Sequence, residues 1–98
     1  DGFRQTSLAI AHWHLGDTEE SDRAMQALLA QQSEGWDWQV VQARAVRGEV
    51  DEAFVALEAA YDNRDTGVQL ILGDQFIENL RGDPQYEAMV EKMGIRVD

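Results

Sequence analysis

His12 and His14 are the only imidazoles in the sequence and the first candidates for metal binding or acid–base chemistry. On a helix, residues two apart point about 200° away from each other, so this pair cannot hold one metal ion as an i, i+4 pair can. The chain has no cysteine, which removes thiol catalysis and Cys-ligated zinc. We therefore expect no metal site, and a packing role for His12.

Two clusters of carboxylates could in principle perform acid–base catalysis. They consist of Glu19, Glu20 and Asp22, and of Glu49, Asp51 and Glu52. Such catalysis needs one acid in an apolar pocket, which the sequence does not indicate, whereas acidic residues stabilise helix N-termini through the helix dipole. The sequence also has no phosphate-binding loop with Lys-Ser/Thr and no distinctive Ser/His/Asp order. We expect no enzyme activity, no catalytic residues and no cofactor.

Length and charge narrow the classes of partner. The chain has 98 residues and a net charge of −11, so we expect one domain spanning 1–98 that binds no nucleic acid, because nucleic acid attracts a surplus of Lys and Arg. No apolar run approaches the ~20 residues that span a bilayer, and we expect no membrane partner. The cytoplasm is the expected compartment, with the periplasm as the alternative. The start at Asp1 suggests a piece of a longer protein.

Glycine, proline and capping residues divide the sequence into helices. We expect helices over 3–15, 18–32, 37–47 and 50–62, with glycine ending the first and third at Gly16 and Gly48. Short helical segments are expected over 67–72 and 75–80, the second partly 3₁₀. Asp83-Pro84 begins a last helix that ends at Gly94. No window alternates apolar and polar residues, so the sequence predicts an all-α protein without a sheet.

Apolar residues recur at helical spacing in each of these helices. The faces that they form are Leu8, Ala11, His12 and Leu15 in the first helix, Ala24, Met25, Leu28, Leu29 and Gln31 in the second, Ala53, Phe54, Leu57, Ala60 and Tyr61 in the fourth, and Tyr86, Met89, Val90 and Met93 in the last. The helices are therefore expected to pack on one another.

The first two pairs of helices resemble each other when the sequence is shifted by 32 residues. Matching positions include Leu8 with Val40, Ala9 with Val41, His12 with Arg44, Gly16 with Gly48, Ser21 with Ala53, Met25 with Leu57, and Leu28 with Ala60. Small residues at matching places let two antiparallel helices approach closely. Each copy therefore predicts a helical hairpin, over about 3–32 and about 36–63.

This pattern resembles the tetratricopeptide repeat (TPR), with His12 and Arg44 where the family usually has an aromatic residue. The string from Phe76 through Leu80-Arg81 and Asp83-Pro84 to Tyr86 is similar to the tail of bacterial TPR arrays. The resemblance implies antiparallel hairpins stacked as a short right-handed superhelix. Two repeats would be followed by a degenerate third hairpin and a capping helix over about 66–95.

The resemblance also implies a concave groove lined by the first helix of each repeat. The groove positions are Thr6, Ile10 and Trp13 in the first repeat, and Trp38, Gln42 and Ala45 in the second. Tryptophan is a common anchor at interfaces, although packing against neighbouring helices is the alternative role of these residues. If Trp38 is a groove anchor, Trp38→Ala should weaken partner binding and leave the fold intact.

The resemblance implies a protein–protein interaction module, the C-terminal adaptor or sensory part of a larger bacterial signalling protein. Its partner is expected to be a basic or apolar protein segment rather than an acidic peptide, since the groove positions lack the Lys and Arg that clamp carboxylates and the chain is strongly acidic. The alternative is self-association, in which exposed apolar surface pairs two copies as a homodimer.

Overall fold

A computed structural model describes residues 2–63 and 74–94, and the described part of the chain consists of helices and turns. The order of the helices is α1 (Gly2–His14), α2 (Thr18–Ala30), the 3₁₀ helix η1 (Gln32–Glu34), α3 (Asp37–Val46), α4 (Val50–Asp62), the 3₁₀ helix η3 (Gln75–Leu80) and α5 (Pro84–Lys92). The all-α prediction is confirmed, as are the boundaries of the predicted helices to within a few residues. The helix expected over 67–72 lies outside the described residues.

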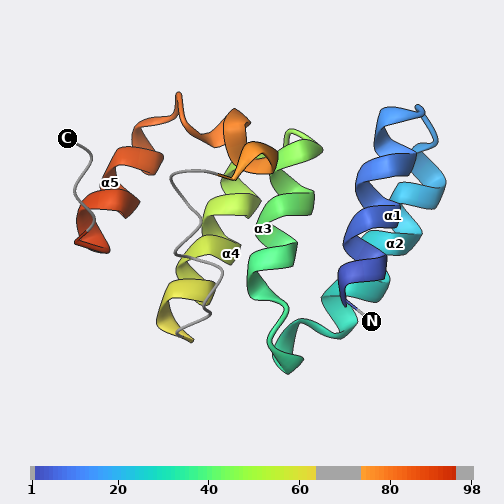
Figure 1. The fold of residues 1–98 in the computed structure, drawn as a ribbon, viewed down its shortest axis with the longest axis horizontal. Helices are drawn as coiled ribbons and strands as arrows, with labels where there is room; N and C mark the ends of the chain where they lie inside the picture. Colours follow the sequence, from blue (N-terminus) through green and yellow to red (C-terminus); the bar gives the residue numbers. More distant parts are fainter. Residues whose placement is uncertain (1, 64–73, 95–98) are drawn as a thin grey trace.

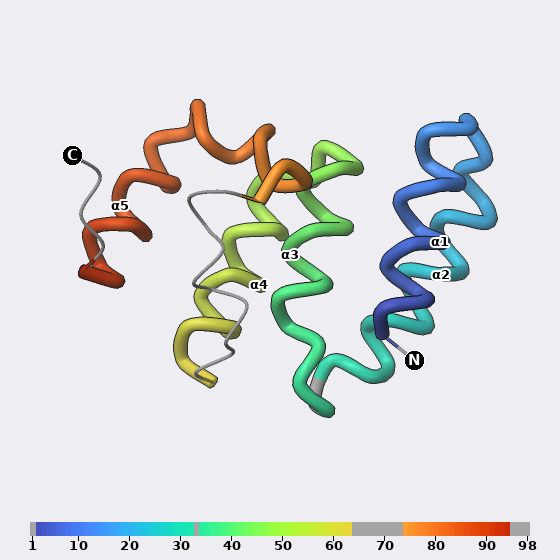
Figure 2. The backbone as a smooth tube through the Cα atoms, in the orientation of Figure 1, coloured from blue at the N-terminus to red at the C-terminus, as the bar shows by residue number. Residues whose placement is uncertain are grey.

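The helices form hairpins that lie next to one another along the long axis of the molecule (Figure 1). Helices α1 and α2 pack together at one end, α3 and α4 follow, and η3 lies against α3. Helix α5 lies beside α4 at the other end, as the backbone trace in Figure 2 also shows. This arrangement confirms the stacked helical hairpins expected from the sequence.

Turn and capping residues explain where the helices begin and end. Gly16 and Gly48 follow α1 and α3 with φ angles of 80° and 77°, a left-handed conformation that is favourable for glycine. Asp17 caps α2 by accepting a hydrogen bond from the Glu20 amide, at 3.4 Å. Asp83 caps α5 by accepting one from the Gln85 amide, at 2.9 Å.

The buried faces of α4 and α5 agree with the spacing of their apolar residues. In α4, Ala53, Leu57 and Ala60 are fully buried, and in α5 Met89 and Val90 belong to the same core. Partly buried Tyr61, Tyr86 and Met93 pack at its edge. The core therefore runs continuously from the first hairpin to α5.

Helix α1 uses a different face from the one that its apolar spacing marks. Its buried residues are Gly2, Thr6, Ala9 and Ile10. Leu8 and Leu15 are instead 36% and 79% exposed. The physical reason is that α1 has apolar residues on two sides and that α2 and α3 cover only one of them.

The N-terminal end of α1 rests on the start of the second hairpin. The Phe3 ring meets the Trp36 ring edge to face, with the centroids 4.8 Å apart. A Cβ atom on Gly2 would lie 2.1 Å from Cδ2 of Trp36, so only glycine fits beneath that ring. Gly2 is thus a position of close approach between α1 and the residue that precedes α3.

Side chains from η3 and α5 contact the second hairpin at a fixed sequence distance. Asn79 donates a hydrogen bond to the Ala45 carbonyl, Gln85 donates one to Asp51, and Lys92 donates one to Glu58. The residues of each pair are 34 positions apart in the sequence. The pairs Gln85–Asp51 and Lys92–Glu58 also show that α5 lies parallel to α4. Helices η3 and α5 therefore both contact the second hairpin.

Candidate partner-binding groove

Asp74 binds two of the three groove positions expected on α3. Its Oδ2 atom accepts hydrogen bonds from Trp38 Nε1, at 3.1 Å, and from Gln42 Nε2, at 2.7 Å. The other carboxylate oxygen accepts the backbone amide of Phe76, at 2.8 Å, and so begins η3. One carboxylate thus fixes the start of η3 over the face of α3 that was expected to line the groove.

Residues of η3 complete the cover over α3. Asn79 Nδ2 donates to the carbonyl of Ala45 at 2.9 Å, and the side chains of Ile77 and Leu80 are fully buried. Ala45 is fully buried and Trp38 is 1% exposed, so neither is an accessible anchor in this structure. The ring of Trp38 belongs to the core, which argues against the expectation that Trp38→Ala spares the fold.

The groove positions expected on α1 face the interior of the stack. Thr6 is 6% exposed, and its Oγ1 donates to the Gly2 carbonyl of the same helix at 2.7 Å. Ile10 is 9% exposed. Trp13 is half-buried, with the Cζ atom of Arg47 5.0 Å from its ring centroid, which is a cation–π contact. Trp13 therefore lies between the hairpins, whereas Thr6 and Ile10 are buried, and the structure does not place the three in one open groove with Trp38.

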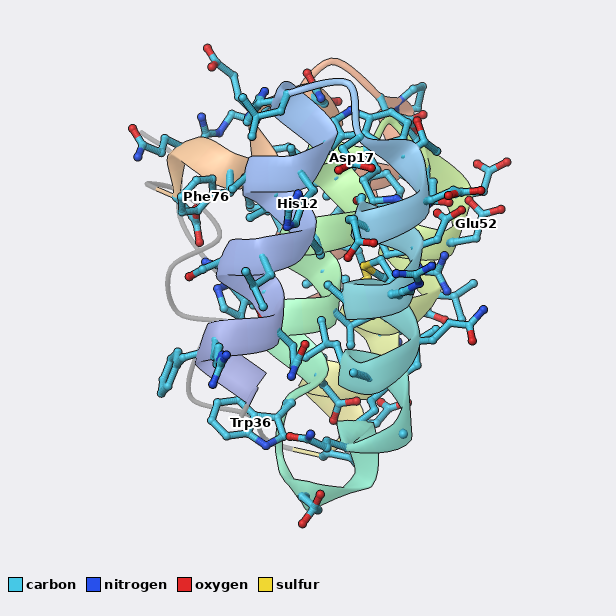
Figure 3. All side chains as sticks on the ribbon, turned by 90° about the vertical axis from the view of Figure 1, so that its right-hand side faces the viewer. His12, Asp17, Trp36, Glu52 and Phe76 are labelled. Atoms are coloured by element: carbon cyan, nitrogen blue, oxygen red, sulfur yellow. The ribbon has the colours of Figure 1, made fainter. Side chains whose placement is uncertain are left out.

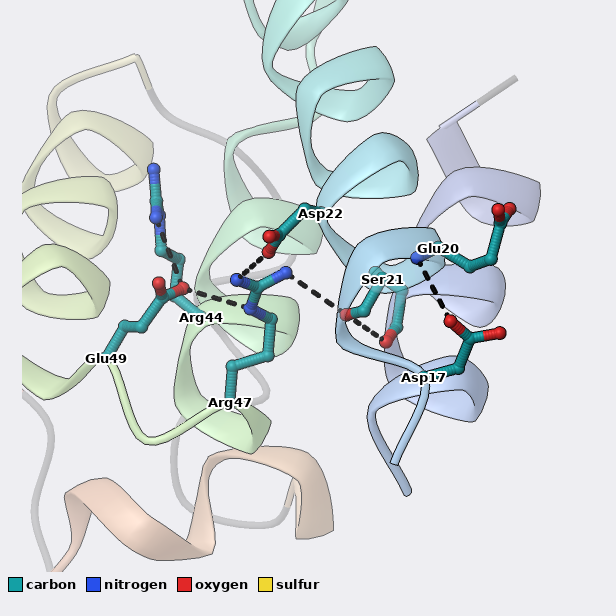
Figure 4. A network of polar contacts seen from close by, with 8 residues as sticks. Asp17, Glu20, Ser21, Asp22, Arg44, Arg47 and Glu49 are labelled. Atoms are coloured by element: carbon teal, nitrogen blue, oxygen red, sulfur yellow. Dashed lines mark hydrogen bonds and ion pairs between the residues drawn. The ribbon is translucent and has the colours of Figure 1, made fainter. Parts of the chain in front are cut away.

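Arg47 joins the two hairpins at this point (Figure 4). Its Nη1 donates to the Ser21 hydroxyl at 3.1 Å and its Nη2 pairs with Asp22, both on α2. The Ser21 hydroxyl donates in turn to the Ala9 carbonyl of α1, at 2.8 Å. On the other side, Arg47 Nε lies 3.3 Å from Glu49 Oε1, an ion-pair distance without hydrogen-bond geometry. A single guanidinium therefore contacts both helices of the first hairpin and the start of α4.

A hollow of about 290 Å³ lies between η3 and the C-terminal ends of α1 and α3. We call it the Phe76 hollow; it is lined by His14, Val46, Gln75, Phe76, Glu78 and Asn79. The Phe76 ring is 38% exposed and supplies apolar surface together with half-buried Val46. Glu78 is the acidic residue of this lining. The hollow has the size and composition to accept one side chain of a partner.

A basic side chain with a long apolar stem matches the chemistry of the Phe76 hollow. Lys and Arg bury their methylene groups against apolar surface and keep the charge at the edge. Here the stem can contact Val46 and Phe76, while the cation can approach the Phe76 ring and the Glu78 carboxylate. The net charge of −11 attracts the same kind of segment over longer distances.

The sequence did not indicate a binding role for any of the six residues that line this hollow. A signal was present in the segment that follows Asp74. An N-capping residue followed by apolar Ile77 and Leu80, three residues apart, is typical of a short helix with one buried side. Because Phe76 lies outside that buried pair, its exposure could have been expected. The ends of α1 and α3 that complete the hollow could not have been predicted, because their positions depend on how the hairpins stack.

His12 and Glu49, two of the candidates for chemistry, make contacts near the ends of helices. His12 Nδ1 lies 3.7 Å from Asp17 Oδ2, beside the turn between α1 and α2 (Figure 3). Glu49 accepts a hydrogen bond from Arg44 at 3.2 Å. No group of three or more His, Asp or Glu residues among the described residues could hold a metal ion. No helix in residues 2–63 and 74–94 is long and apolar enough to cross a membrane.

A second hollow, of about 250 Å³, lies between α4 and α5. It is lined by Phe54, Val55, Glu58, Gln85, Ala88, Met89 and Lys92.

Comparison of the chain with known proteins gives no match to a protein-family model, to a curated protein or to a solved structure.

Proposed function

We propose that the chain is a protein–protein interaction module of the tetratricopeptide-like, helical-repeat type. It binds a basic or apolar segment of a partner protein, with one side chain of that segment anchored in the Phe76 hollow. The proposed setting is the C-terminal adaptor or sensory part of a larger bacterial signalling protein in the cytoplasm. Catalysis is not part of this role.

The observation that supports the proposal is an exposed aromatic ring next to a carboxylate in a strongly acidic molecule. Phe76 is 38% exposed although η3, on which it lies, is otherwise anchored by two fully buried side chains. An aromatic ring in a hollow is a common anchor site, because binding removes its apolar surface from water. The hollow lies beside η3 at the ends of α1 and α3, and its lining contains none of the groove positions expected from the repeat resemblance.

The test is binding of short synthetic peptides, followed by NMR chemical shifts of the protein and by fluorescence anisotropy. The probes are an Arg/Leu peptide, a Glu/Leu peptide of the same pattern and a Lys/Ser peptide without apolar anchors. We expect the Arg/Leu peptide to bind most tightly, to shift the signals of Val46 and Phe76, and to bind more weakly as salt rises. Phe76→Ser should raise its Kd about tenfold.

Val55→Ser is the matched control, since Val55 is an exposed apolar residue of the other hollow, 71% exposed on α4. This substitution should leave the Kd of the Arg/Leu peptide unchanged. Equal binding of the Glu/Leu peptide, or shifts that cluster around Val55 instead of Phe76, would count against the Phe76 hollow as the partner site.

A further inference from the structure

The lining of the Phe76 hollow includes one of the two histidines of the chain. His14 lies in the last turn of α1 and shares this lining with the Phe76 ring and with Glu78 of η3. The residue is exposed, so its imidazole exchanges protons with water. Histidine is the side chain that normally gains or loses its charge between pH 5 and 8. The hollow therefore contains a group whose charge depends on pH in this range.

The two states of His14 give the hollow two different charge patterns. With a neutral imidazole, the Glu78 carboxylate is the charged group of the lining. With a protonated imidazole, a cation and an anion line the same hollow. Glutamate normally stays ionised down to about pH 5.5, so mild acidification adds the positive charge without removing the negative one.

Charged groups on the elements next to the hollow have partners of their own. They are Arg44, Arg47 and Glu49 around the end of α3, Asp74 and Arg81 at the ends of η3, and Asp17 in the turn after α1. Arg44 pairs with Glu49, and Arg47 pairs with Asp22 on α2. Asp74 accepts hydrogen bonds from the side chains of α3, and the Arg81 guanidinium donates to its carbonyl. Asp17 lies beside His12.

A positive charge on His14 acts across the width of the hollow. A roughly spherical hollow of about 290 Å³ is about 8 Å wide, which is similar to the Debye length of about 8 Å at physiological ionic strength. Two like charges at this distance repel each other with little screening. Protonated His14 therefore opposes a cationic side chain bound in the hollow, whereas Glu78 attracts that side chain at either pH.

We propose that His14 makes binding at the Phe76 hollow dependent on pH, so that mild acidification weakens the hold on a basic partner segment. This inference rests on the proposed function, because it requires a cation in the hollow. The coupling is reciprocal: a bound cation favours the neutral imidazole as much as the protonated imidazole disfavours the cation. Binding at mildly acidic pH must therefore release protons from the protein.

The test is the Kd of the Arg/Leu peptide, capped at both ends, at about pH 8 and at about pH 5.5, the limits between which histidine titrates and carboxylates stay ionised. We expect the Kd to be about threefold higher at the lower pH, as repulsion across a solvated hollow implies. His14→Gln should bring the ratio of the two Kd values to about one, whatever its Kd at the higher pH.

His12→Gln is the matched control. His12 lies in the same last turn of α1, so both histidines experience the same helix dipole. It points about 200° away from His14 on the helix. Its Nδ1 atom lies 3.7 Å from Asp17 Oδ2, and it does not line the Phe76 hollow. The His12→Gln variant should keep the threefold ratio of the parent protein.

A Gln/Leu peptide of the same pattern separates charge repulsion from a change in the shape of the hollow. It has no cation, so its Kd should be the same at both pH values. Calorimetry in two buffers with different ionisation enthalpies measures the protons released on binding of the Arg/Leu peptide. The parent protein and His12→Gln should release protons at mildly acidic pH, and His14→Gln should release none.

Two kinds of failure are distinguishable. Equal Kd ratios in the parent protein and His14→Gln, or an equal loss of affinity for the Gln/Leu peptide on acidification, would overturn the role of His14 and leave the peptide site intact. Absence of Arg/Leu binding at the higher pH, or binding that Phe76→Ser does not weaken, would overturn the proposed function and this inference with it.

Discussion

The position of Trp38 in the sequence was compatible with two different roles. Its position in the repeat predicted a groove anchor, and packing was the alternative. The structure favours packing, since the indole is 1% exposed and its Nε1 group donates to Asp74. A buried indole needs such a partner for its N–H group, and Asp74 meets that need from a segment 36 residues away.

Trp38→Ala should therefore destabilise the protein strongly. Loss of a buried Trp side chain costs about 3–5 kcal/mol in the free energy of unfolding, through lost apolar burial and the cavity left behind. It also leaves Asp74 with Gln42 as its remaining side-chain donor from α3. Urea unfolding followed by circular dichroism measures the change. A loss below about 1 kcal/mol would show that η3 does not depend on this ring.

At the scale of the helices, the turns after α1 and α3 depend on backbone geometry. Gly48 has a φ angle of 77°, and no heavy atom lies within 4 Å of the place where its Cβ would be. Any effect of a substitution there arises from the backbone rather than from a clash. Gly82 offers a comparison, since it has equally open surroundings and no left-handed φ.

Gly48→Ala should lower the free energy of unfolding by about 1 kcal/mol, because a left-handed conformation is unfavourable for alanine. Gly82→Ala should be neutral or stabilising, since alanine restricts the unfolded chain. Thermal unfolding of both variants beside the parent protein provides the comparison. Equal losses in the two variants would mean that the turn after α3 tolerates a side chain.

Most helices could be predicted because their signals are local. Gly16, Gly48 and the Asp83-Pro84 pair mark helix ends through their own backbone preferences, which need no information about tertiary structure. The orientation of α1 could not be predicted in this way. Its Leu8 and Leu15 have the correct spacing for a buried face, and only the positions of α2 and α3 decide which side is covered. The Phe76 hollow could not be predicted for the same reason, because it depends on how separate helices pack together.

At the scale of the whole molecule, Arg47 is the polar joint between the two hairpins. Its guanidinium contacts Trp13, Ser21 and Asp22 of the first hairpin and Glu49 of the second. The side chain is 9% exposed, so these contacts are shielded from water. Surface ion pairs contribute little to stability, and a shielded guanidinium with several partners contributes more.

Arg47→Met should lower the free energy of unfolding by about 1–2 kcal/mol, because it removes the charge and the hydrogen bonds and keeps most of the stem. Arg23→Met is the control, since Arg23 is 72% exposed and pairs with Glu20 one helical turn away. We expect the control to change stability by less than about 0.5 kcal/mol. Similar effects in urea unfolding of the two variants would contradict a joint at Arg47.

The three tryptophans lie at three different joints of the stack, and each has its own polar or aromatic neighbour. Trp13 lies beside the Arg47 guanidinium, Trp36 against Phe3 above Gly2, and Trp38 beneath Asp74. Variants that keep a single indole would therefore separate three fluorescence signals. Trp13 would report the contact between the hairpins, and Trp36 would report the packing of α1 on the second hairpin. Trp38 would report the packing of η3 on α3. The order in which these signals change during unfolding would show the order in which the three contacts between helices are lost.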